Sequence, residues 1–128
     1  METIFNALLL NEHGLRATPL GVEIDVRLPW YRALPVSVVE IAALSVDGQP
    51  VDISTLRFDI NGKSFGMSEL AEQVQDFWFV LDSAVLRLPT LQLARGTEHT
   101  VELQLNLYPP YIPHLTWVTQ SRKVIRAQ

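Results

Sequence analysis

Three stretches of the sequence alternate apolar and polar residues with a period of two, and this pattern constrains the fold more than any other feature. The stretch 22–28, VEIDVRL, places an apolar side chain at every second position, and 99–108, HTVELQLNLY, repeats the pattern. A shorter copy covers 55–60, TLRFDI. Successive side chains of a strand point to opposite faces of a sheet, so each stretch is expected to form a strand with one buried face.

Turn residues separate these stretches. Asp47-Gly48 and Asn61-Gly62 supply the positive φ angles that tight hairpins require, and Arg95-Gly96 marks a turn before the longest strand. Together with the other apolar stretches, the pattern predicts strands at 15–17, 21–28, 36–46, 55–60, 63–66, 77–81, 84–88, 98–108 and 115–125.

The stretch Ser68–Gln73, SELAEQ, is the one segment expected to be helical, as a short connector with Ser68 as its N-cap. Many short strands with turn signals about every ten residues are typical of two packed antiparallel sheets. The sequence therefore predicts an all-β fold, a single-domain antiparallel β-sandwich over residues 1–128 with one short connector helix.

Two stretches break the simple alternation. In 36–46, VSVVEIAALSV, and in 77–81, FWFVL, apolar residues fill both faces, and a strand that is apolar on both faces is covered on both. The cover is either a loop or the connector within the monomer, or another subunit, and both remain open. The last strand changes phase between Trp117 and Val124, so we expect a β-bulge at 120–122.

Composition limits the partners. The chain is 48% hydrophobic and 19% charged, more apolar than a usual small domain, so we expect a protein partner to cover part of its surface. The net charge of -4 gives no footprint for nucleic acid or an anionic membrane, and no apolar run suits a membrane span. The lack of cysteine favours a reducing compartment and METIFNALLLNEHG is not a secretory signal, so a cytoplasmic location is expected.

Residues for catalysis are sparse. His13, His99 and His114 lie far apart in the sequence, and none has a second ligand-type residue at metal-ligand spacing. Glu23 and Asp25 fall on the outer face of their strand, where a solvated charge is the ordinary explanation. There is no glycine-rich phosphate loop, nucleophile elbow or HExxH motif. We therefore expect no catalytic residue, metal site or cofactor in this chain.

Two proline-bounded loops carry aromatic side chains, RLPWYRALP at 27–35 and YPPYIPH at 108–114. Proline excludes regular strand or helix there, and a stiff loop after a strong strand is a common place for binding residues. Tyrosine, tryptophan and arginine also anchor many interfaces. The candidates for a partner interface or active-site mouth are Trp30, Tyr31, Arg32, Tyr108, Tyr111 and His114. Alternatively, Trp30 and Tyr111 plug the ends of the sandwich.

An ordered series of motifs resembles a known family. The stretch 26–37, VRLPWYRALPVS, followed by Val46-Asp47-Gly48, resembles the R-(I/L)-P-Y-Y-R-(G/A)-L-P-(L/V)-S opening of the beta subunits of bacterial C-glycoside deglycosidases. Further matches are Phe58, Asn61-Gly62, Glu69-Leu70, Trp78, GTEHTVEL at 96–103 and Tyr111-Ile112-Pro113. The resemblance runs from about Leu15 to Lys123. Trp30, where the family often has tyrosine, and the doubled Pro109-Pro110 depart from it and leave the choice of substrate open.

The resemblance implies an accessory β-sandwich subunit that works only with a larger alpha subunit, a sugar-isomerase-like barrel, in a hetero-oligomer. That partner is expected to hold a divalent metal ion, manganese, together with the catalytic base. Such complexes cleave the carbon-carbon bond of a 3-oxo-C-glycoside. The keto group acidifies the neighbouring sugar proton, a base removes it, and elimination releases the aglycone, with the metal stabilising the enolate. This chain alone is expected to be inactive.

Two other functions remain open. The chain could be a free-standing carbohydrate- or ligand-binding β-sandwich with Trp30, Tyr31 and Trp78 as a stacking platform. It could also be a homo-oligomeric structural domain that self-associates through the apolar face of VSVVEIAAL, residues 36–44.

Overall fold

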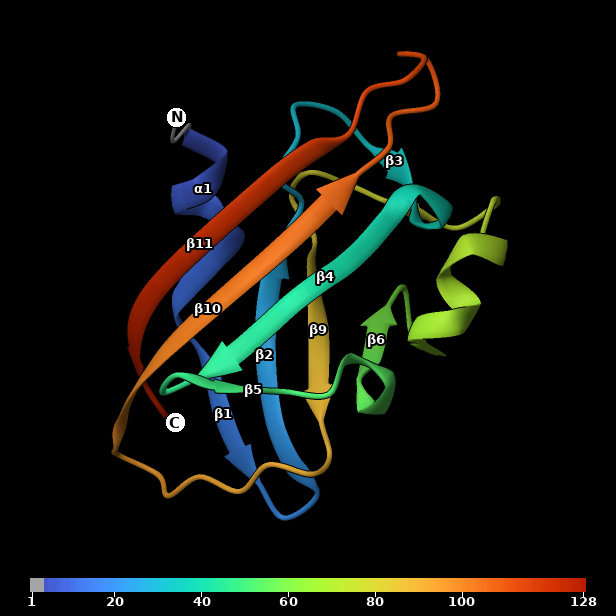
Figure 1. The fold of residues 1–128 in the computed structure, drawn as a ribbon. Helices are drawn as coiled ribbons and strands as arrows, with labels where there is room; N and C mark the ends of the chain where they lie inside the picture. Colours follow the sequence, from blue (N-terminus) through green and yellow to red (C-terminus); the bar gives the residue numbers. More distant parts are fainter. Residues whose placement is uncertain (1–3) are drawn as a thin grey trace.

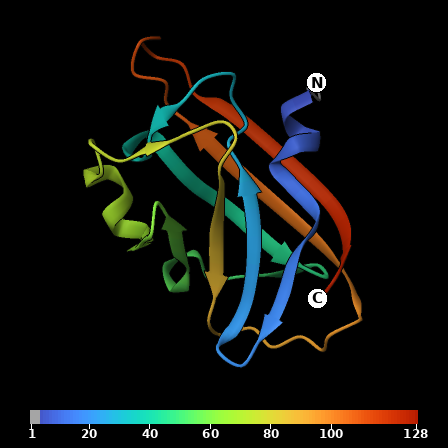
Figure 2. The ribbon, with the colours of Figure 1, turned by 180° about the vertical axis from the view of Figure 1, so that it is seen from behind.

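The computed structural model describes residues 4–128, and its two antiparallel sheets pack face to face (Figure 1). In spatial order, one sheet contains β1 (Leu10–Thr18), β2 (Gly21–Arg27), β9 (Ser83–Leu88), β6 (Arg57–Ile60) and β7 (Lys63–Gly66). The other contains β11 (Trp117–Arg126), β10 (Glu98–Leu107), β4 (Val39–Val46) and β5 (Gln49–Pro50). A short ribbon pairs β3 (Leu34–Pro35) with β8 (Phe77–Trp78). Seen from behind, the strands of the two sheets cross obliquely (Figure 2). The predicted all-β sandwich is confirmed.

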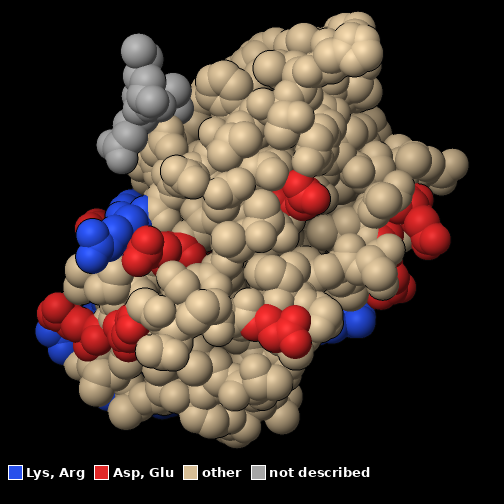
Figure 3. Space-filling model, viewed as in Figure 1, with Lys and Arg blue, Asp and Glu red and all other residues tan. Residues whose placement is uncertain are grey.

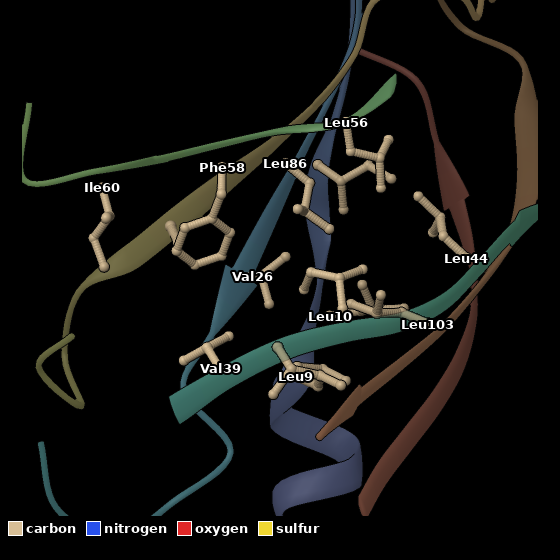
Figure 4. Close-up of a cluster of buried hydrophobic side chains, with 14 of the residues drawn as sticks. Leu9, Leu10, Val26, Val39, Leu44, Leu56, Phe58, Ile60, Leu86 and Leu103 are labelled. Carbon is tan, nitrogen blue, oxygen red and sulfur yellow. The ribbon is translucent and has the colours of Figure 1, made fainter. Parts of the chain in front are cut away.

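The core fills the space between the sheets. Phe58 and Leu86 of the five-stranded sheet point toward Leu44 and Leu103 of the four-stranded sheet, and all four side chains are buried (Figure 4). Phe58 and Leu103 come from the alternating stretches, where the period-two pattern identified the inward face correctly.

The structure has more short helical segments than the sequence predicted. Within residues 4–128 the structure has α1 (Ile4–Leu9) and the 3-10 helices η1 (Val36–Val38), η2 (Ile53–Thr55) and η3 (Met67–Glu72). The expected connector helix is η3. Its first turn is capped differently from the prediction, because the backbone N–H of Gly66 donates to Glu69 Oε1 at 2.7 Å and Gly66, not Ser68, is the N-cap. The expectation that only this segment is helical was wrong.

Each predicted strand has a counterpart, and the two glycine hairpins are confirmed. Asp47 and Gly48 have φ of 53° and 78°, and Asn61 and Gly62 have 55° and 75°. Strands β4, β6, β8 and β11 each lack two or three residues at one predicted end. Residues 36–38 form η1 after Pro35, and 79–81 form a turn closed by the Asp82 N–H on the Phe79 carbonyl at 3.0 Å. The short strands β3 and β5 were not predicted.

Strand β4 contains a β-bulge at Ala42. Gln104 of β10 lies opposite Ala43 and Leu105 lies opposite Ile41, so Ala42 is the extra residue. Val39 and Ile41 before the bulge and Leu44 and Val46 after it are all buried. The interpretation of 36–46 as a strand with two apolar faces was therefore wrong, because one inward face changes its parity at the bulge. The proposed self-association through this stretch loses its basis.

Strand β11 contains no bulge at 120–122, which corrects the prediction made there. Its pairing with β10 is unbroken from Glu98 opposite Arg126 to Leu107 opposite Trp117. Val124 is exposed on the outer face, and Lys123 lies on the inner side. Lys123 Nζ donates to the carbonyls of Ala7 and Leu10, at 3.1 and 2.8 Å, and thereby caps the end of α1. The apolar pattern of β11 is interrupted because the inward position beside α1 holds the polar side chain of Lys123 and not an apolar one.

The carboxylates Glu23 and Asp25 belong to an ion-pair network on the outer face of the five-stranded sheet. Arg16 forms a bidentate pair with Asp25, at 2.7 and 2.8 Å, and bonds Glu23 at 3.0 Å. Hydrogen bonding to Asp25 raises the pKa of Arg16. Arg87 bonds both Glu23 and Asp59. The network ties β1, β2, β9 and β6 together, which gives these carboxylates a structural role.

Asp47 links the β4–β5 turn to the start of β10. Replacing its carboxylate with a neutral group should change the free energy of unfolding by an amount that depends on pH. Asp47 accepts bonds from His99 Nδ1 at 2.6 Å and the Thr100 N–H at 2.9 Å, and the bond with His99 is the main reason that its pKa is lowered. A lowered pKa stabilises the fold above the unfolded value of about 3.9, and this contribution is lost as the pH falls through the folded value.

We therefore expect Asp47→Asn, which keeps the turn preference, to cost about 0.5 kcal/mol at pH 7, the scale of an exposed ion pair. Urea unfolding should show the two proteins converging in strong acid. A difference that stays constant with pH would contradict this account.

Candidate functional site

Three loops meet at one end of the sandwich, and we call them together the aromatic end: 28–33, 79–82 and 108–116. Strands β2 and β10 lie in different sheets but run in the same direction, so the loops that follow them leave from the same side (Figure 1). The turn at 79–82 lies at the same end (Figure 1) and is held by the indole Nε1 of Trp78, which donates to the Asp82 carbonyl at 2.8 Å.

Trp30 lies at the base of the aromatic end and is only 7% exposed. Its ring stacks on Phe5 of α1 with centroids 6.4 Å apart, and meets the edge of Trp117 at 5.3 Å. These contacts place the indole as a plug between the sheets, one of the two alternatives that the sequence left open. Any contact of Trp30 with a partner is therefore indirect, through the residues it supports.

A chain of hydrogen bonds connects Trp30 to both loops. The indole Nε1 donates to the Tyr111 hydroxyl at 2.6 Å, and the Tyr111 hydroxyl donates to the Tyr31 hydroxyl at 3.2 Å. The rings of Trp30 and Tyr31 also pack with centroids 4.9 Å apart. The buried tryptophan thus fixes two exposed tyrosines from loops 80 residues apart.

Arg32 completes this cluster. Its guanidinium carbon lies 5.0 Å from the centroid of the Tyr111 ring, in the range of a cation–π contact. The structure therefore brings four of the six predicted residues together: Trp30, Tyr31, Arg32 and Tyr111.

Tyr108 belongs to a separate cluster with Glu40, a residue that the sequence did not single out. Its hydroxyl donates to Glu40 Oε1 at 2.7 Å, and Asn106 Nδ2 donates to the same oxygen at 3.0 Å. These bonds, that of Tyr108 first, lower the pKa of Glu40, and the carboxylate raises the pKa of Tyr108. Both side chains line a cleft of about 900 Å³ between β4 and the helices η2 and η3.

His114 is exposed at the far part of the loop, with a φ of 64°. Among residues 4–128, no hydrogen bond, ion pair or ring contact joins it to the Trp30 cluster. It shares the aromatic end with the other candidates but not their contacts.

Sequence reasoning missed two supports of the cluster, Phe5 and Trp117. Phe5 lies in a helix that was not predicted, and Trp117 was assigned to a strand without a role. The only available signal was that both are large aromatic residues beside an aromatic loop or apolar run. Their adjacency to Trp30 depends on the order of the strands, which the sequence does not reveal.

The proposed stacking platform of Trp30, Tyr31 and Trp78 is not present. Trp78 is 0% exposed and packs edge-on against Phe58 with centroids 5.4 Å apart. A buried ring cannot stack on a sugar, so the residues named for a free-standing carbohydrate-binding module do not form its platform.

The aromatic end is poor in charge. Its loops contain two formally charged residues, Arg32 and Asp82, besides His114. In Figure 3 the upper part of the visible face shows neither basic nor acidic atoms, whereas charged groups gather lower down. Exposed apolar side chains occupy the same loops, including Tyr31 at 61%, Leu81 at 79% and Phe79 at 53%. A charge-poor surface rich in tyrosine is typical of a protein interface.

The described residues offer no cluster of metal ligands. Among residues 4–128, no three His, Cys, Asp or Glu side chains converge in a way that could hold a metal ion. No helix in this part of the chain is long and apolar enough to cross a membrane.

The fold and the aromatic end together define a class: a small all-β protein whose loops at one end form a hydrogen-bonded, charge-poor aromatic surface. Comparison with known proteins gives its family. The family model for the C-glycoside deglycosidase beta subunit matches residues 2–111. The chain belongs to this family.

Individual relatives are named as beta subunits of deglycosidases. A 3'-dehydrocarminate deglycosidase beta subunit from a Microbacterium species is 38% identical over 86% of this chain and 83% of the relative. A C-glycoside deglycosidase beta subunit from Arthrobacter globiformis is 43% identical over 79% of this chain and 78% of the relative. One from Microbacterium trichothecenolyticum is 39% identical over 81% and 79%. The resemblance inferred from the sequence motifs is confirmed.

Proposed function

We propose that this chain is an accessory subunit that docks through its aromatic end on a larger barrel-shaped alpha subunit and shapes the mouth of that subunit's active site. The observation that carries the proposal is the hydrogen-bonded connection from Trp30 through Tyr111 to Tyr31. It makes one rigid surface of two loops, and a surface ordered before binding loses little conformational entropy on docking. The name beta subunit supports the existence of a partner chain.

The proposed reaction of the complex is cleavage of the carbon-carbon bond between a 3-oxo sugar and its aglycone. The name of one relative specifies a 3'-dehydro substrate, which supports an oxidised sugar as the reactant. A base removes the proton from the carbon between the ketone and the carbon that bears the aglycone. The electron pair of the broken carbon–hydrogen bond forms a carbon–carbon double bond in the sugar as the bond to the aglycone breaks. The aglycone leaves with the bonding pair and takes up a proton.

The catalytic groups of this reaction are assigned to the partner. A divalent metal ion, proposed to be manganese, and the base would lie in the alpha subunit, as the family resemblance implies. The contribution of this chain is to bind, to order the rim of the active site and to exclude water from it. The cysteine-free sequence supports a cytoplasmic location for the complex.

Reconstitution tests the proposal. We expect this chain alone to show no cleavage of a 3-oxo-C-glycoside, and an equimolar mixture with the alpha subunit to elute as one hetero-oligomer and release the aglycone. The control is the alpha subunit alone, which should be much less active. Full activity of this chain alone, or a stable monomer that never associates with the alpha subunit, would disprove the proposal.

A further inference from the structure

The phenol pair at the aromatic end has one hydrogen-bond donor left over. The indole N–H of Trp30 can only donate, so it occupies one acceptor position on the Tyr111 oxygen. The bond between the two phenols uses one of their two hydrogens. The remaining O–H, that of Tyr31, has no acceptor among the described residues, and its side chain is 61% exposed.

Arg32 is a cation without an acidic partner. Five other arginines pair with carboxylates, as Arg16 does with Asp25 and Arg126 with Glu98, whereas Arg27 and Arg95 have no ion pair among residues 4–128. Among residues 4–128, no carboxylate oxygen lies within 4.0 Å of the Arg32 guanidinium, which contacts the face of Tyr111 instead. That contact orients the side chain and leaves its N–H donors free.

We propose that Arg32 and the Tyr31 hydroxyl form a two-donor site for one carboxylate of the partner subunit. This inference rests on the proposed function, because it names the chemistry by which the aromatic end recognises the alpha subunit. A guanidinium binds a carboxylate in a planar, two-pronged geometry, and a phenol O–H can donate to either carboxylate oxygen.

The surroundings of the site favour this assignment. Trp30 and Tyr111 hold the donors in place before binding, so little side-chain entropy is lost. The exposed apolar side chains of the same loops exclude water on docking, which strengthens the ion pair. A single unpaired cation on a charge-poor surface sets the register of two proteins, because any misaligned partner leaves that charge buried and unpaired.

The test uses the reconstituted complex with Arg32→Gln, Arg32→Lys and Tyr31→Phe, and measures the dissociation constant of the subunits at low and high salt. We expect Arg32→Gln to weaken binding roughly 30-fold or more and to flatten its salt dependence. Arg32→Lys should recover part of the affinity, and Tyr31→Phe should lose about tenfold. Arg95→Gln is the matched control, since Arg95 is an exposed arginine in the loop at the opposite end and should leave binding unchanged.

The outcomes separate this inference from the proposed function. If wild-type chain and Arg32→Gln bind the alpha subunit equally well, the carboxylate site is wrong while the docking proposal survives. If subunit affinity is unchanged but the KM for a substrate with an anionic aglycone rises, the donors serve the substrate and the assignment to the partner is overturned. If the wild-type chain does not bind the alpha subunit at all, the proposed function itself fails. Thermal unfolding of each variant verifies that the fold is intact.

Discussion

Replacing Trp30 with alanine should destabilise the chain by about 3–5 kcal/mol, the usual loss when a buried tryptophan is truncated. The indole is almost fully buried between Phe5 and Trp117, so its removal leaves a cavity that two large rings cannot close without moving. Urea unfolding followed by circular dichroism measures the change. A variant as stable as the wild type would show that the indole is not part of the core.

Trp30→Phe separates packing from hydrogen bonding. Phenylalanine keeps an aromatic plug but lacks the N–H, so the Tyr111 hydroxyl loses its donor at 2.6 Å. We expect a smaller loss of stability, about 1–2 kcal/mol. We also expect weaker binding to the partner, because the two tyrosines are no longer fixed. If Trp30→Phe binds the alpha subunit as tightly as the wild type does, the hydrogen-bonded connection has no part in docking.

Val118→Ala is a suitable control for both variants. Val118 lies on the outer face of β11 next to Trp117 in sequence, but its side chain is half exposed and does not enter the core. Its truncation should change the free energy of unfolding by no more than about 0.5 kcal/mol.

The strands could be predicted because their cause is local. In 22–28 and 100–107 the polar and apolar residues alternate without interruption, and burial of the apolar set requires nothing from elsewhere in the chain to fix which face turns inward. Glycine hairpins have a local cause as well, since the positive φ at Asp47 and Asn61 is set by the turn itself. Helix α1 was missed because six residues cannot form a stable helix alone, and Lys123 caps its end from a strand far along the chain.

The candidate site was predictable as two loops but not as one surface. Proline and aromatic residues identify each loop in the sequence. The hydrogen bond from Trp30 to Tyr111, however, depends on which strands are neighbours in space. Tyr108 and Tyr111 are three residues apart in sequence, but they belong to different clusters because Tyr108 turns toward Glu40. Sequence spacing could not separate them.

The bulge in β4 explains why the period-two pattern failed to identify the inward face in 36–46. Val39 and Ile41 have odd numbers and Leu44 and Val46 even ones, and the extra residue Ala42 allows all four side chains to point inward.

Removal of the extra residue should therefore be tolerated. Deletion of Ala42 should give VEIALSV, a strand with strict alternation, in which every pairing with β10 is preserved. We expect the variant to fold, with a change in stability within about 1 kcal/mol.

Deletion of Ser45 is the matched control, because it also shortens β4 by one residue. Here the best realignment removes the bulge but places Ala43 at the inward position of Leu44, so the core loses a buried leucine. The cost should be about 2–5 kcal/mol, the range for leucine-to-alanine truncations in cores. Urea unfolding of the two deletions gives the comparison. If deletion of Ala42 destabilises the protein as much as deletion of Ser45 does, this account of the bulge is wrong. The core would then require the twist that the bulge gives to β4, and not only the inward placement of its apolar residues.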